Sequence, residues 1–149
     1  MKPGIRYQFH HMGIPCDTPR EGESYSAKAG MFTADNPGAF RIQWHRFTPE
    51  STLHPLIRTV PHTAFKVDDL AMAIAGETLL LGPYEPIDGY RVAIIDDGGV
   101  PVELMETDLP DGESGRAPAA ARGRCTAIEA WMRFERIDRH CERCEAMTD

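Results

Sequence analysis

The sequence lacks the features of a membrane or secreted protein. No apolar run approaches the roughly 20 residues that a membrane-spanning helix requires, and Lys2 is not followed by the apolar segment of a secretory signal. Its cysteines, Cys16, Cys125, Cys141 and Cys144, are too few and too unevenly spaced for a disulfide scaffold, so reduced thiols are expected. These absences predict a cytoplasmic protein with no membrane partner.

Positive charge is also scarce. The formal net charge is -7, and the pI is near 5.3. A protein that binds nucleic acid regardless of sequence needs clustered Lys and Arg side chains for its phosphate contacts. We therefore expect no nucleic-acid partner.

The segment 61–107 predicts one βαβββ unit in a chain of 149 residues, 42% apolar, which is long enough for a domain with a substantial core. Residues 62–67 alternate as a strand does. Asp68 is expected to cap a short helix that ends near Gly76. Residues 78–82 predict a buried strand, and the two prolines between Gly82 and Pro86 predict a loop.

Two further strands, 90–95 and 100–105, flank the sequence Asp-Asp-Gly-Gly, which is a strong hairpin signal. Val102 and Leu104 are expected to face the helix. Glu103 then points to the opposite face, and we expect His62 to share that helix-free face.

The first half of the chain predicts fewer elements. Residues 6–15 read as a strand with Phe9, His11 and Gly13 on one face, and residues 16–27 as a loop. Residues 28–33 and 40–47 predict a hairpin. In its second strand Gln43 and His45 share an unusually polar face, and a linker of residues 48–60 follows.

These segments, HHMGIP, then PHTAFKVDDL, then GGVPVELMET, resemble the glyoxalase-like vicinal oxygen chelate superfamily. The resemblance implies an α+β fold in which two βαβββ modules, here 5–48 and 61–107 within a domain of residues 1–109, pair into a cup-shaped mixed sheet. Module one is expected to lack its helix and to be one strand short. The implied metal ligands are His11, Gln43, His62 and Glu103, with His45 as the alternative to Gln43.

The implied cofactor is a divalent metal ion, and the donor set suits Ni, Co, Fe, Mn or Zn. The resemblance implies a lyase or isomerase that moves a proton next to a carbonyl of a small oxygenated metabolite, with Glu103 and Gln43 as catalytic residues. An Fe(II) ring-cleaving dioxygenase using His11, His62 and Glu103, or a resistance-type protein that binds its ligand without catalysis, are the alternatives. A homodimer is also implied.

Each of these residues has a simpler interpretation. Taken alone, His62 is more often a hydrogen-bonded structural histidine, and Glu103 the exposed position of an alternating strand. Only their expected convergence on one face favours a metal site.

Four residues are candidates for substrate contact. Arg91 and Lys66 can pair with an anionic group, although a surface salt bridge is the commoner role for Lys66. Tyr84 lies in the expected Gly82–Pro86 loop, where a lid can close, and His45 lies on the polar face of its strand.

Residues 110–149 predict a linker and then a helix over 118–147 with an apolar stripe, and its role is not indicated by the resemblance. Cys141 and Cys144 form a CxxC beside His140. One such pair without a second ligand pair is a weak zinc signal, so packing or incidental thiols are favoured.

Overall fold

The computed structural model describes residues 1–109 except residues 28 and 37. The predicted C-terminal helix and the Cys141–Cys144 pair lie outside this range. The strands are β1 (Tyr7–Pro15), β2 (Ser24–Ser26), β3 (Met31–Asp35), β4 (Ile42–Phe47), β5 (His62–Val67), β6 (Thr78–Ile87), β7 (Tyr90–Asp97) and β8 (Val100–Thr107). The helices are α1 (Pro55–Thr59) and α2 (Leu70–Ile74).

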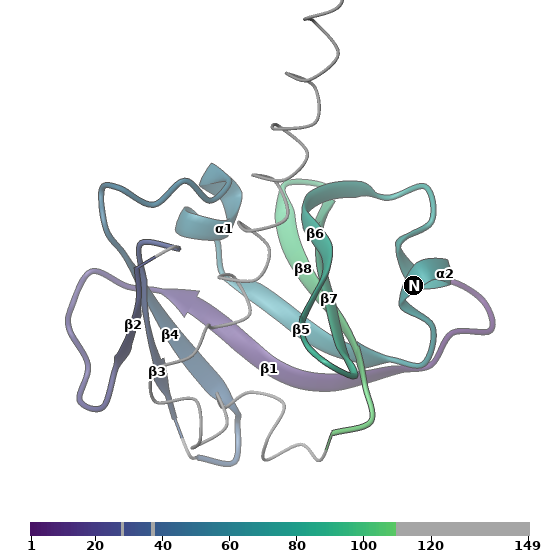
Figure 1. The fold of residues 1–149 in the computed structure, drawn as a ribbon, viewed down its shortest axis with the longest axis horizontal. Coiled ribbons are helices and arrows are strands. Elements are labelled where there is room, and N and C mark those ends of the chain that lie inside the picture. The colour runs from purple at the N-terminus through teal and green to yellow at the C-terminus, as the bar shows by residue number, and fades with distance from the viewer. Residues whose placement is uncertain (28, 37, 110–149) are drawn as a thin grey trace, which may run out of the picture.

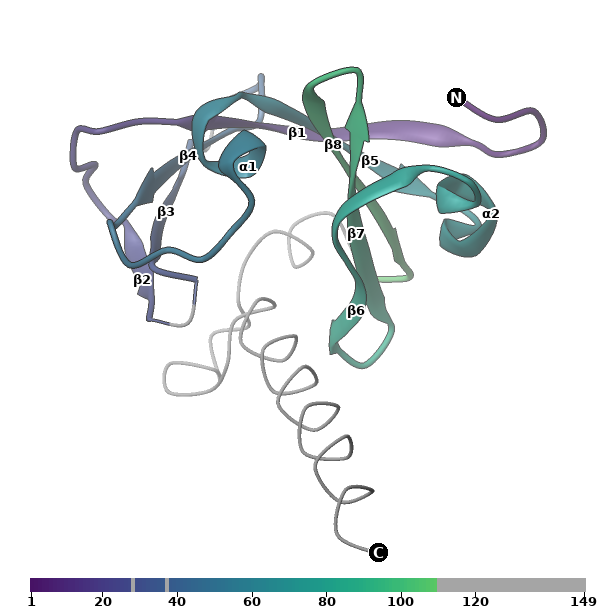
Figure 2. The same ribbon diagram turned by 90° about the horizontal axis from the view of Figure 1, so that it is seen from above.

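All of these strands form one mixed sheet in the order β2-β3-β4-β1-β5-β8-β7-β6. Module one is β1–β4 and module two is β5–β8, and the antiparallel pair β1–β5 joins them. The two halves curl to the same side of β1, so the sheet forms a cup (Figures 1 and 2). The predicted cup-shaped α+β fold is confirmed, and no helix lies between β1 and β2, a stretch that the structure describes in full.

Helix α2 covers the outer face of module two, because the sequence places apolar residues on the sides that meet. Its buried Leu70 and Ala73 pack against the outer face of β7 and β8, where Ala93, Ile95 and Leu104 lie. The N-cap is Asp69 rather than the expected Asp68, and its carboxylate accepts a hydrogen bond from the Met72 amide. Helix α2 therefore covers only the outer face of module two.

A second core cluster joins the two modules inside the cup. Ile57 of α1 and Leu53 before it pack with Ala29 of module one and with Leu81 and Ile94 of module two. Helix α1 lies within the stretch predicted to be a linker, and the His54 side chain caps its first turn. Neither helix of the described chain combines the length and hydrophobicity that a membrane crossing requires.

Two expected loops contain strand residues. Residues 24–26 form β2, so module one has four strands and is not a strand short. The Gly82–Pro86 stretch belongs to β6. Proline is tolerated there because β6 is an edge strand, and its ladder with β7 shifts register on both sides of Tyr84.

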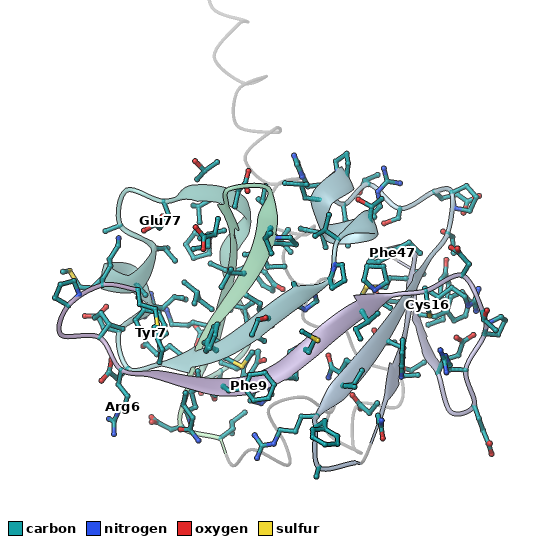
Figure 3. The ribbon with its side chains drawn as sticks, turned by 180° about the vertical axis from the view of Figure 1, so that it is seen from behind. Arg6, Tyr7, Phe9, Cys16, Phe47 and Glu77 are labelled. Atoms are coloured by element: carbon teal, nitrogen blue, oxygen red, sulfur yellow. The ribbon has the colours of Figure 1, made fainter. Side chains whose placement is uncertain are left out.

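A bulge in β1 changes which residues face the cup. Phe9 pairs with Phe65, but the next pair is His11 with Ala64, so His10 is an extra residue. Phe9 and His11 therefore do not share a face as predicted. Phe9 is 44% exposed and lies on the outside of β1 (Figure 3), whereas His10 and His11 are both buried.

Gly13 lies opposite His62 in the β1–β5 ladder. A Cβ atom at Gly13 would lie 2.0 Å from Cε1 of His62 and 2.3 Å from its Nε2. No real contact is that short, so the absence of a side chain at residue 13 leaves the space that the His62 ring occupies.

We predict that Gly13→Ala lowers the free energy of unfolding by about 1–3 kcal/mol, the usual cost of overpacking. In a His62→Ala background the same change should cost much less, because the clashing ring is gone. Urea denaturation of the four proteins in this cycle measures the coupling. An equal cost in both backgrounds would show that the ring does not limit residue 13.

Candidate metal centre

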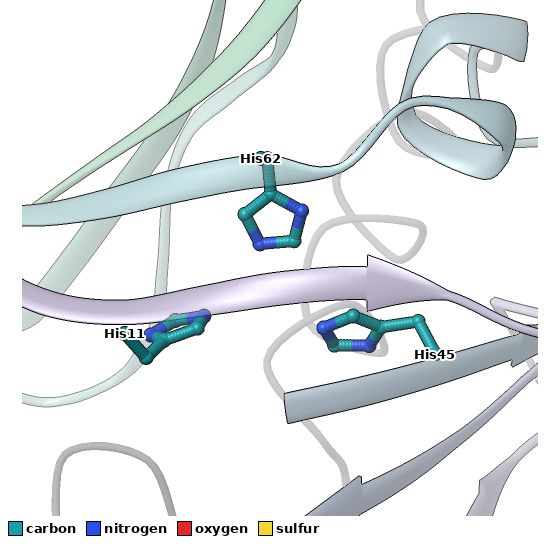
Figure 4. Close-up of side chains that lie close together, drawn as sticks. All are labelled: His11, His45 and His62. Carbon is teal, nitrogen blue, oxygen red and sulfur yellow. The ribbon is translucent and has the colours of Figure 1, made fainter. Parts of the chain in front are cut away.

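Three histidines from three neighbouring strands meet inside the cup. His11 on β1 lies between His45 on β4 and His62 on β5, because β1 pairs with both of those strands. One ring nitrogen from each lies within 4.8 Å of the other two, and all three residues are buried. Figure 4 shows the rings turned toward a common point. We call these residues the histidine triad.

Glu103 on β8 adds a carboxylate to the histidine triad. Its Oε2 lies 3.4 Å from Nε2 of His62 and 3.9 Å from Nε2 of His11. Glu103 is opposite Ala64 in the parallel β5–β8 ladder. Ala64 shares its face with His62, the first residue of β5, so Glu103 lies on the inner face beside His62. The expectation that His62 and Glu103 share the face opposite helix α2 is confirmed, although that face is not free of helices, because α1 packs inside the cup.

The Nε2 atoms of the histidine triad are buried, and none has a hydrogen-bond partner within the described part of the chain. The 3.4 Å separation of His62 from Glu103 is within ion-pair range but does not meet hydrogen-bond geometry. An unsatisfied buried polar atom costs about 1–3 kcal/mol. Three clustered imidazoles with a carboxylate beside two of them are donors that a divalent transition-metal ion binds, so these residues fit one.

The other ring nitrogens of two triad members do have partners. Nδ1 of His45 lies 3.4 Å from Oγ1 of Thr33, its neighbour on β3. Nδ1 of His11 lies 2.8 Å from Nδ1 of His10. A partner that accepts from Nδ1–H leaves the Nε2 lone pair available to a metal.

Burial sets the charge of two triad members, His11 and His45. It lowers the pKa of His11 to about 4, and nearby His62 and His10 lower it further while Glu103 opposes. Burial likewise lowers the pKa of His45 to about 3. For Glu103, burial alone would raise the pKa, but its interactions with the nearby imidazoles of His62, His11 and His45 outweigh burial and lower it. At neutral pH, His11 and His45 are therefore neutral and Glu103 is ionised.

The structure brings His45 to the triad and gives Gln43 a different partner. The Gln43 amide nitrogen donates to Oδ1 of Asp35 at 2.8 Å, across the β3–β4 ladder. Gln43 and His45 both project to the inner face of β4, but they are two residues apart, which is about 7 Å along a strand. The alternative ligand His45 is thus the one at the cluster, and a ligand role for Gln43 stays a prediction.

Two candidate substrate contacts lie away from the triad. Arg91 is on the outer face, where Nη1 donates to Oε1 of Glu106 at 3.1 Å, and Glu106 in turn accepts from the Leu70 amide at the start of α2. Lys66 is four residues from His62, about 13 Å along the strand. Both line a separate cavity of about 580 Å³ at the other end of β5.

Tyr84 lies closer to the site. It packs with the inner-face residues of both modules, and its pKa is raised by burial and by the negative charge of Glu103. Burial and the negative charge of Glu103 also raise the pKa of Tyr90. The Tyr90 hydroxyl donates a hydrogen bond to Sδ of Met105 at 3.5 Å. Both phenols are therefore protonated at neutral pH.

His10 lies at the site beside His11, although the sequence pattern did not predict it as a site residue. The one signal in the sequence is the pair of adjacent histidines at positions 10 and 11. Strict alternation sends them to opposite faces, and only the bulge turns both inward.

One solved structure supports the fold. No family model matches the chain, and no curated protein matches it. It is similar to the solved structure of a hypothetical protein from Bacillus halodurans C-125, with a TM-score of 0.53 and 18% identity over 70% of this chain and 96% of that one. Methylmalonyl-CoA epimerase from Mycobacterium tuberculosis gives a TM-score of 0.48 and 20% identity over 68% of this chain and 88% of that one. The likeness to the Bacillus structure, which spans nearly the whole of that protein, supports the fold alone.

Proposed function

We propose that this chain is a glyoxalase-like protein of the vicinal oxygen chelate type, in which His11, His45, His62 and Glu103 bind a divalent metal ion and the cup binds a small oxygenated metabolite. The observation that carries the proposal is that one ring nitrogen from each of three buried histidines lies within 4.8 Å of the other two, while the Nε2 atom of each ring has no hydrogen-bond partner in the described chain. Buried polar atoms in a protein core normally have a hydrogen-bond partner, so three without one indicate that a ligand binds them.

The donor set narrows the choice of ion. Burial holds the imidazoles of His11 and His45 neutral, and a neutral imidazole is the form that binds a metal. The ionised Glu103 would offset part of the positive charge of the ion. Imidazole and carboxylate together suit Zn, Fe, Co, Ni or Mn, whereas Mg and Ca prefer oxygen ligands alone. When bound, such an ion supplies a Lewis acid next to the substrate's carbonyl oxygen.

The chain's own groups then have defined roles. Glu103 is ionised, so it can hold the ion or accept a proton from the carbon next to a carbonyl. Tyr84 keeps its proton and can donate a hydrogen bond to a substrate oxygen. The surrounding inner face is apolar, with Ala64, Val92 and Met105 buried, and excludes water. This arrangement suits proton transfer in a lyase or isomerase.

Metal content tests the ligand set. We expect purified, untagged protein to hold about one transition-metal ion per chain, and His45→Ala, His62→Ala and Glu103→Gln each to lose most of it. Gln43→Ala is the matched control on the same face of β4 and should keep its ion. Elemental analysis with thermal unfolding separates ligand loss from misfolding. Full metal content in His45→Ala and loss in Gln43→Ala would return Gln43 to the ligand set.

Proton transfer tests the reaction class. We expect the metal-loaded protein to speed deuterium uptake at the carbon next to the carbonyl in some member of a panel of small hydroxyketones in heavy water. Tyr84→Phe should reduce that rate about 10-fold or more while metal content is unchanged, because one positioned donor is lost. Oxygen consumption with Fe(II) and a catechol, without any exchange, would instead identify a ring-cleaving dioxygenase.

The pKa values of His11 and His45 predict how stability depends on pH. His11 and His45 have folded-state values of about 4 and 3, below the ordinary 6.5. Between pH 7 and 5 the unfolded chain therefore binds more protons, and stability must fall as the pH falls.

We expect metal-free protein to lose on the order of 3 kcal/mol of unfolding free energy between pH 7 and pH 5, at about 1.4 kcal/mol per pKa unit. Urea denaturation with a chelator present measures this, and His45→Asn should show a smaller loss. Stability that is equal or higher at pH 5 would contradict neutral, buried imidazoles.

A further inference from the structure

The bulge in β1 turns two consecutive histidines toward the inside of the cup. Gln8 pairs with Lys66 and Phe9 with Phe65, and after the extra residue His11 pairs with Ala64. Alternation from Phe9 puts His10 on the inner face, and the bulge puts His11 there as well. Both are only 6% exposed. A second imidazole is therefore buried directly beside a triad member.

The two rings are joined through their Nδ1 atoms, which lie 2.8 Å apart. The ring centroids are 5.1 Å apart and the ring planes are 77° from parallel, so the contact is made in the plane of at least one ring and is not a stack. An N–H···N bond needs one protonated and one unprotonated nitrogen. The pair therefore has two possible proton arrangements.

Metal binding selects one of these arrangements. Nε2 of His11 is the buried atom without a partner, and it lies 3.9 Å from Glu103. A neutral imidazole that offers its Nε2 lone pair carries its proton on Nδ1. His11 must then be the donor to His10, and His10 must accept with an unprotonated Nδ1.

We propose that His10 is the positioning residue for His11: its Nδ1 accepts the Nδ1–H of His11, which holds the His11 ring in the tautomer and orientation that present Nε2 to the ion. This inference rests on the proposed metal site. The contact is much closer than the one at His45, where Thr33 Oγ1 is 3.4 Å from Nδ1. His10 thus orients one ligand of the triad more tightly than Thr33 orients another.

Two substitutions separate this role from simple packing. His10→Phe keeps a buried ring and removes the acceptor, whereas His10→Asn gives up ring volume and places an amide oxygen close to the position of Nδ1. Zn²⁺ affinity of the full chain, measured by competition with a chromogenic chelator, is the readout. Thermal unfolding of the metal-free proteins reports on the fold.

We expect His10→Phe to bind Zn²⁺ about 10- to 100-fold more weakly than the unaltered protein, the usual effect of losing a group that orients a metal ligand. His10→Asn should recover most of that loss although it packs less well. Packing alone predicts the reverse order, with His10→Asn the weaker binder, and that order would overturn the inference.

Imidazole nitrogen NMR on the unaltered, Zn²⁺-loaded protein gives an answer that needs no variant to fold. We expect a scalar coupling across the hydrogen bond between the two Nδ1 atoms, with the proton on His11. A protonated Nδ1 on His10, or no coupling, would overturn the inference. If the unaltered protein binds Zn²⁺ tightly and His10→Phe binds it equally well, the role of His10 is overturned but the proposed metal site is not. If the unaltered protein does not bind Zn²⁺, both the role of His10 and the proposed function are overturned.

Discussion

The antiparallel pairing of β1 with β5 is the constraint on which the rest of the structure depends. It joins the two modules into one sheet and sets Gly13 opposite His62, which leaves room for that ring. The parallel neighbours of this pair, β4 and β8, then bring His45 and Glu103 to the same place. A shift of one residue in this register would turn the facing side chains of one strand to the outside of the cup. The site exists because the register is fixed.

The metal-free site lowers the stability of the fold. Three imidazoles are buried without partners among the described residues for their Nε2 atoms, and each such atom typically costs about 1–3 kcal/mol. Buried hydrophobic residues at the same positions would be more stabilising. An ion that binds only the folded chain would offset the cost, since its binding free energy adds to the stability of that state. We therefore expect the bound and free proteins to differ clearly in stability.

Alternation in the sequence predicts much of the fold and part of the site. It places Leu104 against α2 and sends Glu103 and His62 to the inner face, because a regular strand has a period of two. The same rule cannot choose between Gln43 and His45, because the two residues have the same parity and alternation does not say which of them reaches the triad. It fails at His10, where a bulge adds a residue. Arg91 is on the outer face with Ala93 and Ile95, so its parity matched the helix side rather than the cup.

The histidine triad with Glu103 is the central claim, and X-ray absorption of the Zn²⁺-loaded full chain tests it most directly. The account predicts a first shell of nitrogen and oxygen at about 2.0–2.2 Å with the multiple scattering of about three imidazoles, and no sulfur. A sulfur shell at about 2.3 Å would assign the metal to cysteines such as Cys141 and Cys144. That result, or a spectrum without imidazole, would contradict the account.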